Sequence, residues 1–153
     1  MQHEMRQRAR QRLDERLLTL KPEDRLQPPP KGWIRAIRDA IGMSGTQLAT
    51  RLGIRPQTVA TIERSEATGS IQLATLRRAA EALDCTLVYA LVPRTSLGEA
   101  VERRAREIAI RDLQRVARTM ALEAQGTGDS GMEARIDAYI RSAIKDHDLW
   151  DER

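Results

Sequence analysis

Apolar residues recur at helical spacing along most of this chain. Trp33, Ile34, Ile37 and Ile41 fall on one face of a predicted helix, which Gly42 ends. The same spacing predicts further helices over residues 4–20, 44–52, 56–64, 73–83 and 97–124 and from about 130 to 144. The pattern therefore predicts a mainly α-helical protein.

Local signals mark where several of these helices begin. Ser44 and Gln47 have the Ser-x-x-Gln order of a capping box, and residues 96–99 repeat such a box ahead of the long helix. Gly53 ends one short helix, and Pro56 occupies a favourable first-turn position in the next. The sequence therefore predicts two short helices joined by a glycine turn.

Residues 86–92 have a different pattern. They are rich in β-forming residues, are apolar on both alternating faces, and end at Pro93. A lone strand leaves its backbone donors and acceptors unpaired, and no other segment of the chain supplies a second strand. We therefore expect two copies of the chain to pair antiparallel as a homodimer. The dimerising residues would be Leu87, Val88, Tyr89, Ala90, Leu91 and Val92.

These elements divide the chain into four parts. Residues 1–27 are predicted to form an amphipathic N-terminal arm, and the three prolines at 28–30 an extended linker. Residues 31–94 would form the main domain with its terminal strand. Residues 95–153 would form a C-terminal helical hairpin that contacts a second copy or another protein.

Charge distinguishes these parts from one another. The chain has 153 residues and a net charge of +4 at pH 7. Residues 31–94 carry nine Lys or Arg against five Asp or Glu, whereas residues 119–153 carry four against eight. The main domain therefore has the charge that suits nucleic acid, and the C-terminal end has the opposite charge.

Composition excludes several other classes of protein. No apolar run is long enough for a membrane span, and the N-terminus has no apolar stretch typical of a signal peptide. Cys85 is the single cysteine, so no intrachain disulfide can form, as in proteins of a reducing compartment. We expect a cytoplasmic protein with no membrane contact.

The glycine turn lies within a constellation typical of a helix-turn-helix. This motif needs a small residue where the two helices cross and a glycine in the turn. It also needs aliphatic residues that hold the second helix in place. Ala49, Gly53, Val59 and Ile62 meet these needs, with Leu48 beside them. The second helix of this pair would enter the major groove of duplex DNA.

The predicted DNA-reading residues are polar positions that are not needed for packing. They are Arg55, Gln57, Thr58, Thr61 and Arg64. Gln57 suits adenine, Arg55 suits guanine or a phosphate, and Thr61 suits thymine. Arg55 and Arg64 could equally contact phosphates or only solvent instead of bases. Thr46, Arg51 and Lys31 are candidate phosphate contacts that position the protein without specifying sequence.

Enzymatic chemistry has little support. His3 and His147 lie on peripheral segments, and Cys85 begins the predicted strand. Metal-ligand spacing and a glycine-rich phosphate loop are both missing from the sequence, so we expect no enzyme activity, metal or cofactor. Glu63 is interpreted as a structural partner within its helix, and Tyr89 as a core or interface residue.

Residues 33–83 resemble the Xre (phage-repressor-like) helix-turn-helix family. The resemblance implies a five-helix-type helix-turn-helix domain. Together with the one dimerising β-strand, the N-terminal helical arm and the C-terminal helical hairpin predicted above, this gives a mainly α fold. Family members often have glutamine where this chain has Gly45, and many keep a backbone donor where it has Pro56. Individual DNA contacts are therefore expected to differ.

A longer resemblance covers most of the chain. It rests on residues 29–37, 43–44, 79–83, 87–93 and 119–123, which are similar to the mobile mystery protein A family. The resemblance implies a regulator or antitoxin encoded beside a Fic-domain protein. Fic inhibitors use a helix with a Ser/Thr-x-x-x-Glu motif, which Thr119 and Glu123 match although Ala124 replaces the motif's Gly or Asn. The resemblance implies that Glu123 pairs with an arginine of the partner.

Three hypotheses follow for the function. The first is an autorepressing antitoxin that binds a pseudo-palindromic operator in double-stranded DNA and restrains a Fic-domain partner. The second is a plain Xre-type transcriptional repressor with no toxin partner. The third is an interaction scaffold with no role at DNA, which salt-dependent duplex binding would distinguish from the other two.

Overall fold

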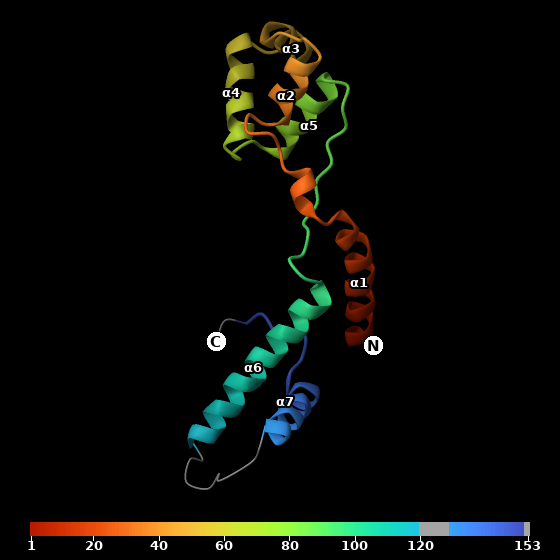
Figure 1. Ribbon diagram of the computed structural model, residues 1–153, viewed down its shortest axis with the longest axis vertical. Coiled ribbons are helices and arrows are strands. Elements are labelled where there is room, and N and C mark those ends of the chain that lie inside the picture. Colours follow the sequence, from red (N-terminus) through yellow and green to blue (C-terminus); the bar gives the residue numbers. More distant parts are fainter. Residues whose placement is uncertain (120–128, 152–153) are drawn as a thin grey trace. The chain divides into compact units, whose positions relative to one another are not determined.

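The computed structural model describes residues 1–119 and 129–151 of the chain. It divides into two compact units, which are described separately (Figure 1). The central unit is Lys21–Leu91, and the terminal unit combines Met1–Leu20 with Val92–Arg153. Every regular element of the described residues is helical, which confirms the predicted mainly α fold.

The central unit contains one short 3₁₀ helix and four α-helices. The 3₁₀ helix is η2 (Glu23–Leu26), and the α-helices are α2 (Trp33–Ala40), α3 (Gly45–Leu52), α4 (Pro56–Ala67) and α5 (Leu73–Ala82). Helix α3 packs against both α4 and α5, and α2 packs against α4. Each helix directs its apolar stripe toward the other three, as the sequence periodicity predicts.

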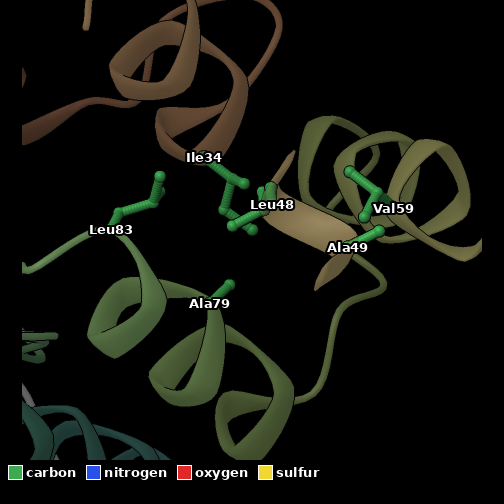
Figure 2. Close-up of a cluster of buried hydrophobic side chains, with 6 residues drawn as sticks. All are labelled: Ile34, Leu48, Ala49, Val59, Ala79 and Leu83. Atoms are coloured by element: carbon green, nitrogen blue, oxygen red, sulfur yellow. The ribbon is translucent and has the colours of Figure 1, made fainter. Parts of the chain in front are cut away.

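One aliphatic cluster holds these four helices together. Figure 2 shows its six buried residues, Ile34, Leu48, Ala49, Val59, Ala79 and Leu83. Leu48 has no exposed surface and lies at the centre of the cluster. The predicted helix-turn-helix positions Ala49 and Val59 are both buried, and Ile62 packs against the cluster from α4. The core is therefore the one that the sequence pattern predicts.

The predicted helix ends are also confirmed. The Gln47 backbone N–H donates to the Ser44 hydroxyl over 3.1 Å, and the Ser44 N–H donates to the Gln47 side-chain oxygen over 2.8 Å. Gly53 ends α3 with a φ of +66°, a left-handed conformation that glycine adopts without strain. Pro56 is the first residue of α4. Three local signals therefore determine where α3 begins and ends and where α4 begins.

Helix α2 begins on a carboxylate from α4. The Glu66 side chain accepts hydrogen bonds from the backbone N–H groups of Trp33, over 2.8 Å, and Ile34, over 2.9 Å. Gly32 has a φ of +84°, and a Cβ atom there would lie 2.7 Å from a Glu66 oxygen. Glycine at 32 is therefore needed both for the backbone conformation and for the close approach of Glu66.

A second polar contact joins α2 and α4. The Arg38 guanidinium donates to both oxygens of Glu63, over 2.6 and 3.3 Å, and also to the Met43 carbonyl over 2.8 Å. The hydrogen bond with Glu63 raises the pKa of Arg38, while burial opposes the shift. Glu63 is thus a structural partner, in agreement with the sequence interpretation.

The terminal unit contains α1 (Gln2–Leu17), the 3₁₀ helix η1 (Leu18–Leu20), α6 (Leu97–Thr119) and α7 (Asp129–Ala143). Helix α6 packs against both α1 and α7, so the predicted C-terminal helical pair is present. Ala105, Ile108 and Leu149 form a buried cluster, to which Ile140 and Ile144 add partly buried side chains. The end of the predicted 97–124 helix lies outside the described residues.

Helix α1 supplies a cap for α6. The Asp14 carboxylate accepts from the backbone N–H groups of Leu97, over 2.7 Å, and Gly98, over 3.1 Å. The predicted capping box is also present, with Glu99 N–H donating to the Ser96 hydroxyl and Ser96 N–H to the Glu99 carboxylate. The backbone donors of the first turn of α6 are therefore satisfied by a local and a distant residue together.

Three expectations differ from the structure. Residues 86–91 adopt no regular secondary structure, because a single chain offers their backbone no partner strand. Residues 31–94, all described, contain four α-helices rather than the five that the Xre resemblance implies, since residues 84–94 contain no helix. Helix α1 has no buried residue, and Leu13 is 47% exposed, so α1 lacks the buried apolar stripe expected of an amphipathic arm.

Candidate nucleic-acid interface

The turn between α3 and α4 is held by backbone hydrogen bonds. The Gly53 N–H donates to the Thr50 carbonyl over 3.2 Å, and the Ile54 N–H to the Ala49 carbonyl over 3.0 Å. Arg55 is extended and precedes Pro56, so α4 leaves the turn in a new direction. Val59 and Glu63 are the buried residues of α4, which leaves the opposite side of the helix to solvent.

Four of the five predicted DNA-reading residues are exposed on α4, and the fifth, Arg55, is the residue that caps it. Arg55, Gln57, Thr58, Thr61 and Arg64 are exposed. Gln57, Thr61 and Arg64 follow the i, i+4, i+7 spacing of one helix face. The Thr61 hydroxyl donates to the Gln57 carbonyl over 3.2 Å, while the Arg55 and Arg64 guanidinium groups have no hydrogen bond to any described residue. The structure thus places these residues together with donors available for a ligand.

The candidate phosphate contacts lie elsewhere in the central unit. Thr46 is exposed in the first turn of α3, and Arg51 is exposed in its last turn. The Arg51 guanidinium donates to the Ala82 carbonyl over 2.9 Å, so this residue also joins α3 to the end of α5. Thr46 and Arg51 therefore lie at opposite ends of α3, about 7–8 Å apart along the helix axis.

A small hollow brings the third candidate, Lys31, next to α4. It has a volume of about 280 Å³, and its lining includes Lys31, Arg35, Glu63 and Arg64. Arg35, in the first turn of α2, is a cation that the sequence reasoning missed. The hollow therefore collects three cations around the side of α4.

Three acidic residues of this unit have partners within the fold. Glu63 is bound by Arg38, and Glu66 by the first backbone N–H groups of α2. Asp39 forms ion pairs with Arg35, over 3.7 Å, and with Arg38, over 3.1 Å. Three of the seven acidic side chains of this unit are thus engaged within the fold. Arg55 and Arg64 have no ion pair to the described residues.

The residues predicted to dimerise are largely exposed in the single chain. Val88 is 83%, Tyr89 65% and Leu91 86% exposed, and Ala90 is exposed as well. Leu87 and Val92 are half-buried. An extended segment with three large exposed apolar residues is an unusual surface for a monomer.

Other kinds of site are not present in the described part of the chain. No group of three or more His, Cys, Asp or Glu side chains is placed to hold a metal ion there. None of the described helices is long and apolar enough to cross a membrane. Cys85 is a free thiol whose sulfur contacts the Leu83 carbonyl, and His3 pairs with Asp146 in the terminal unit.

Comparison with known proteins agrees with this geometry. Residues 34–89 match the family model HTH_3, described as helix-turn-helix. The chain matches no curated protein and no solved structure. The matched segment runs from the first turn of α2 to Tyr89 and contains the whole α3-turn-α4 pair. Residues 34–89 are therefore a helix-turn-helix domain, which indicates a DNA-binding transcriptional regulator.

Proposed function

We propose that this chain is a sequence-specific transcriptional regulator that reads duplex DNA with helix α4. The observation that carries the proposal is that α4 and its capping residue Arg55 expose five polar residues directly after the glycine turn. The opposite side of the helix is anchored by Val59 in the aliphatic core. A rigidly held helix with free donors on one side is the geometry that major-groove reading requires.

Within this proposal the residues of α4 have different roles. Gln57, in the first turn, pairs with adenine through its side-chain amide, and Arg55 donates to guanine or to a phosphate. Thr58, Thr61 and Arg64 extend the contact along the helix. Lys31, Thr46 and Arg51 bind the sugar-phosphate backbone and set the register of the protein on DNA.

Two copies of the chain act together in this proposal. Residues 86–92 pair antiparallel across a two-fold axis, which gives their backbone groups partners and covers Val88 and Leu91. Two recognition helices related by this axis would contact half-sites about 34 Å apart, so the operator is pseudo-palindromic. Proline at Val88 or Ala90 should remove a ladder donor and give monomers with low operator affinity. A proline variant that stays dimeric in sedimentation would rule out this interface.

The test of DNA reading begins with selection of a bound sequence from random duplexes. At about 150 mM salt, the selected duplex should bind far more tightly than a scrambled duplex. Gln57→Ala should lower the discrimination between the selected and the scrambled duplex by about 1–3 kcal/mol. Lys31→Ala should instead weaken binding to every duplex and reduce the slope of log affinity against log salt concentration by about one. Equal affinity for selected and scrambled DNA would contradict the proposal.

We further propose that the chain is an autorepressing antitoxin that restrains a Fic-domain partner. This rests on the resemblance to the mobile mystery protein A family and on the acidic C-terminal end. Thr119 ends α6, and its hydroxyl donates to the Arg115 carbonyl over 2.9 Å, whereas Glu123 lies outside the described residues. In this mechanism Glu123 forms a charge-assisted pair with a partner arginine and prevents productive ATP binding.

Co-purification with the product of the neighbouring gene separates this role from that of a plain repressor. The Fic-domain protein should associate with the chain at micromolar concentration, and Glu123→Gly should release its nucleotide transfer without dissolving the complex. Equal inhibition by the wild type and Glu123→Gly would remove the glutamate mechanism. Failure of the two proteins to associate would leave the plain Xre-type repressor.

A further inference from the structure

The terminal unit contains a large cavity between helices α1, α6 and α7. Its volume is about 950 Å³, which lies within the range of small-molecule sites in proteins. Side chains of all three helices line it, together with residues of the segment that follows α7. None of its lining residues belongs to the helix-turn-helix domain, so its chemistry can be considered separately from DNA binding.

One wall of this cavity is apolar. Val101 and Ala105 of α6 face it, as do Ile140 of α7 and Ile144 and Leu149 from the segment after α7. Leu149 is only 2% exposed, and the Arg104 side chain holds its carbonyl over 2.7 Å. The wall is therefore a fixed surface on which an apolar body could pack.

The rim of the cavity is cationic. Arg6 and Arg10 of α1 line it, and so do Arg141 and Lys145. The acidic lining residues are Asp14, Glu102 and Asp146, and Asp14 is already engaged by the backbone of α6. Positive charge thus exceeds negative charge among the groups that remain available to a ligand.

Arg10 is the most informative residue of this rim. Its side chain is only 19% exposed, yet its guanidinium donates no hydrogen bond to any described residue. Its ion contact is with one oxygen of Asp146 over 3.9 Å, and Arg6 shares the same oxygen at the same distance. That oxygen is itself buried without a hydrogen bond. The unused donors of this guanidinium therefore line the cavity and can bind a ligand there.

We propose that this cavity binds a small amphipathic organic anion. The anionic group, a carboxylate or sulfonate, accepts hydrogen bonds from Arg10, with Arg6 beside it, in the planar geometry that guanidinium favours. The apolar body of the ligand packs on the wall formed by Val101, Ile140 and Leu149. Arg141 and Lys145 at the rim add electrostatic attraction.

The test compares two fluorescent probes that differ only in charge. These are 1-anilinonaphthalene-8-sulfonate and its uncharged parent, N-phenyl-1-naphthylamine, each titrated into the full chain. The sulfonate should bind saturably at one site per chain and more tightly than the parent. Arg10→Gln should weaken sulfonate binding about tenfold or more and leave binding of the parent within about twofold, because only the charge-assisted contact is lost.

Arg8→Gln is the matched control. Arg8 is an exposed arginine on the same helix that does not line the cavity, so its replacement should leave both affinities unchanged. Ile140→Ala should weaken both probes to a similar extent. An unchanged sulfonate affinity in Arg10→Gln, or an equal loss in Arg8→Gln, would overturn the proposal.

Amide chemical shifts of the wild-type chain give a second test that does not depend on a variant folding. The sulfonate should shift signals of α1, of Gly98 and of Leu149, and leave those of α4 in place. Shifts confined to the central unit, or an absence of saturable shifts, would overturn the proposal as well. The Arg10→Lys variant should lose part of the affinity, since lysine keeps the charge but not the planar pair of donors.

Discussion

The four-helix core of the central unit and the attachment of α1 in the terminal unit depend on different interactions. The central unit buries six aliphatic side chains from α2, α3, α4 and α5 in one cluster. In the terminal unit, α1 has no buried residue and is attached through Asp14 to α6 and through His3 to Asp146. Aliphatic packing is sensitive to lost volume, whereas polar attachment is sensitive to lost hydrogen bonds and to pH. A substitution in the central core and one in the attachment of α1 should therefore act differently.

The two tryptophans allow this comparison to be made in one chain. Trp33 lies in the central unit and Trp150 in the terminal unit. Trp150→Phe leaves the Trp33 fluorescence as a reporter of the central unit, and Trp33→Phe leaves Trp150 as a reporter of the terminal unit. Both residues are substantially exposed, so neither replacement removes a core side chain.

The largest effect is expected from a cavity in the central core. Leu48→Ala should lower the free energy of unfolding of the central unit by about 3–5 kcal/mol, because Leu48 has no exposed surface. Urea unfolding followed by Trp33 fluorescence measures this change. Leu73→Ala is the control, since Leu73 is 46% exposed on α5 and should cost much less. Similar losses in both variants would contradict the description of the core.

A smaller loss is expected from the polar contact between α2 and α4. Arg38→Met should lower the free energy of unfolding of the central unit by about 3 kcal/mol, because Glu63 would stay largely buried without its partner. The double variant Arg38→Met with Glu63→Leu should recover much of this loss in the same urea experiment. If the double variant is as unstable as the sum of the single variants, the pair is not coupled as we describe.

In the terminal unit, the cap on α6 should contribute less to the free energy of unfolding than the contact between Arg38 and Glu63 does in the central unit. Asp14→Ala should lower the free energy of unfolding by about 1–2 kcal/mol, because two backbone donors lose their acceptor. Hydrogen exchange at the Leu97 and Gly98 amides should accelerate accordingly. Glu15→Ala, the neighbouring exposed acid, is the control and should leave these rates unchanged. Equal rates in the Asp14 variant and the wild type would exclude the cap.

The smallest expected effect is the change in stability that accompanies ionisation of the Tyr139 phenol at high pH. The Tyr139 hydroxyl donates to Asp112 over 3.0 Å, and this hydrogen bond raises the pKa of the phenol. An acid with a raised pKa in the folded state contributes stability below its unfolded pKa of about 10 and loses it as the pH rises through the folded value. Ultraviolet titration of tyrosinate should show this late ionisation, and Asp112→Asn should bring it to a lower pH. Tyr139→Phe should abolish the step.

Much of the central unit could be predicted from the sequence because its determinants are local. The Ser44 and Gln47 capping box, the Gly53 turn and the Pro56 helix start each act within a few residues, and all three are confirmed. The terminal unit was harder to predict. The acid that caps α6 is Asp14, which lies 83 residues earlier, and no spacing rule connects the two.

In the candidate site too, features set by local sequence could be predicted and features set by helix packing could not. Periodicity is sufficient to place Gln57, Thr61 and Arg64 on the exposed side of α4. It could not show that Arg51 reaches the Ala82 carbonyl or that Arg35 joins Lys31 and Arg64 around one hollow, since these depend on how separate helices pack. The antiparallel pairing of residues 86–92 remains a prediction, because pairing between two copies cannot be observed in a single chain.

The cap between Asp14 and α6 also has a consequence for synthesis of the protein. The central unit lies between the two pieces of the terminal unit in the chain, so it leaves the ribosome while α1 still lacks its partner. Domains generally fold as units during translation, the earlier ones first. The helix-turn-helix domain can therefore acquire its shape while the protein is still being made. Helix α1 must wait for the chain to continue past residue 98, when the amides that Asp14 binds have been synthesised.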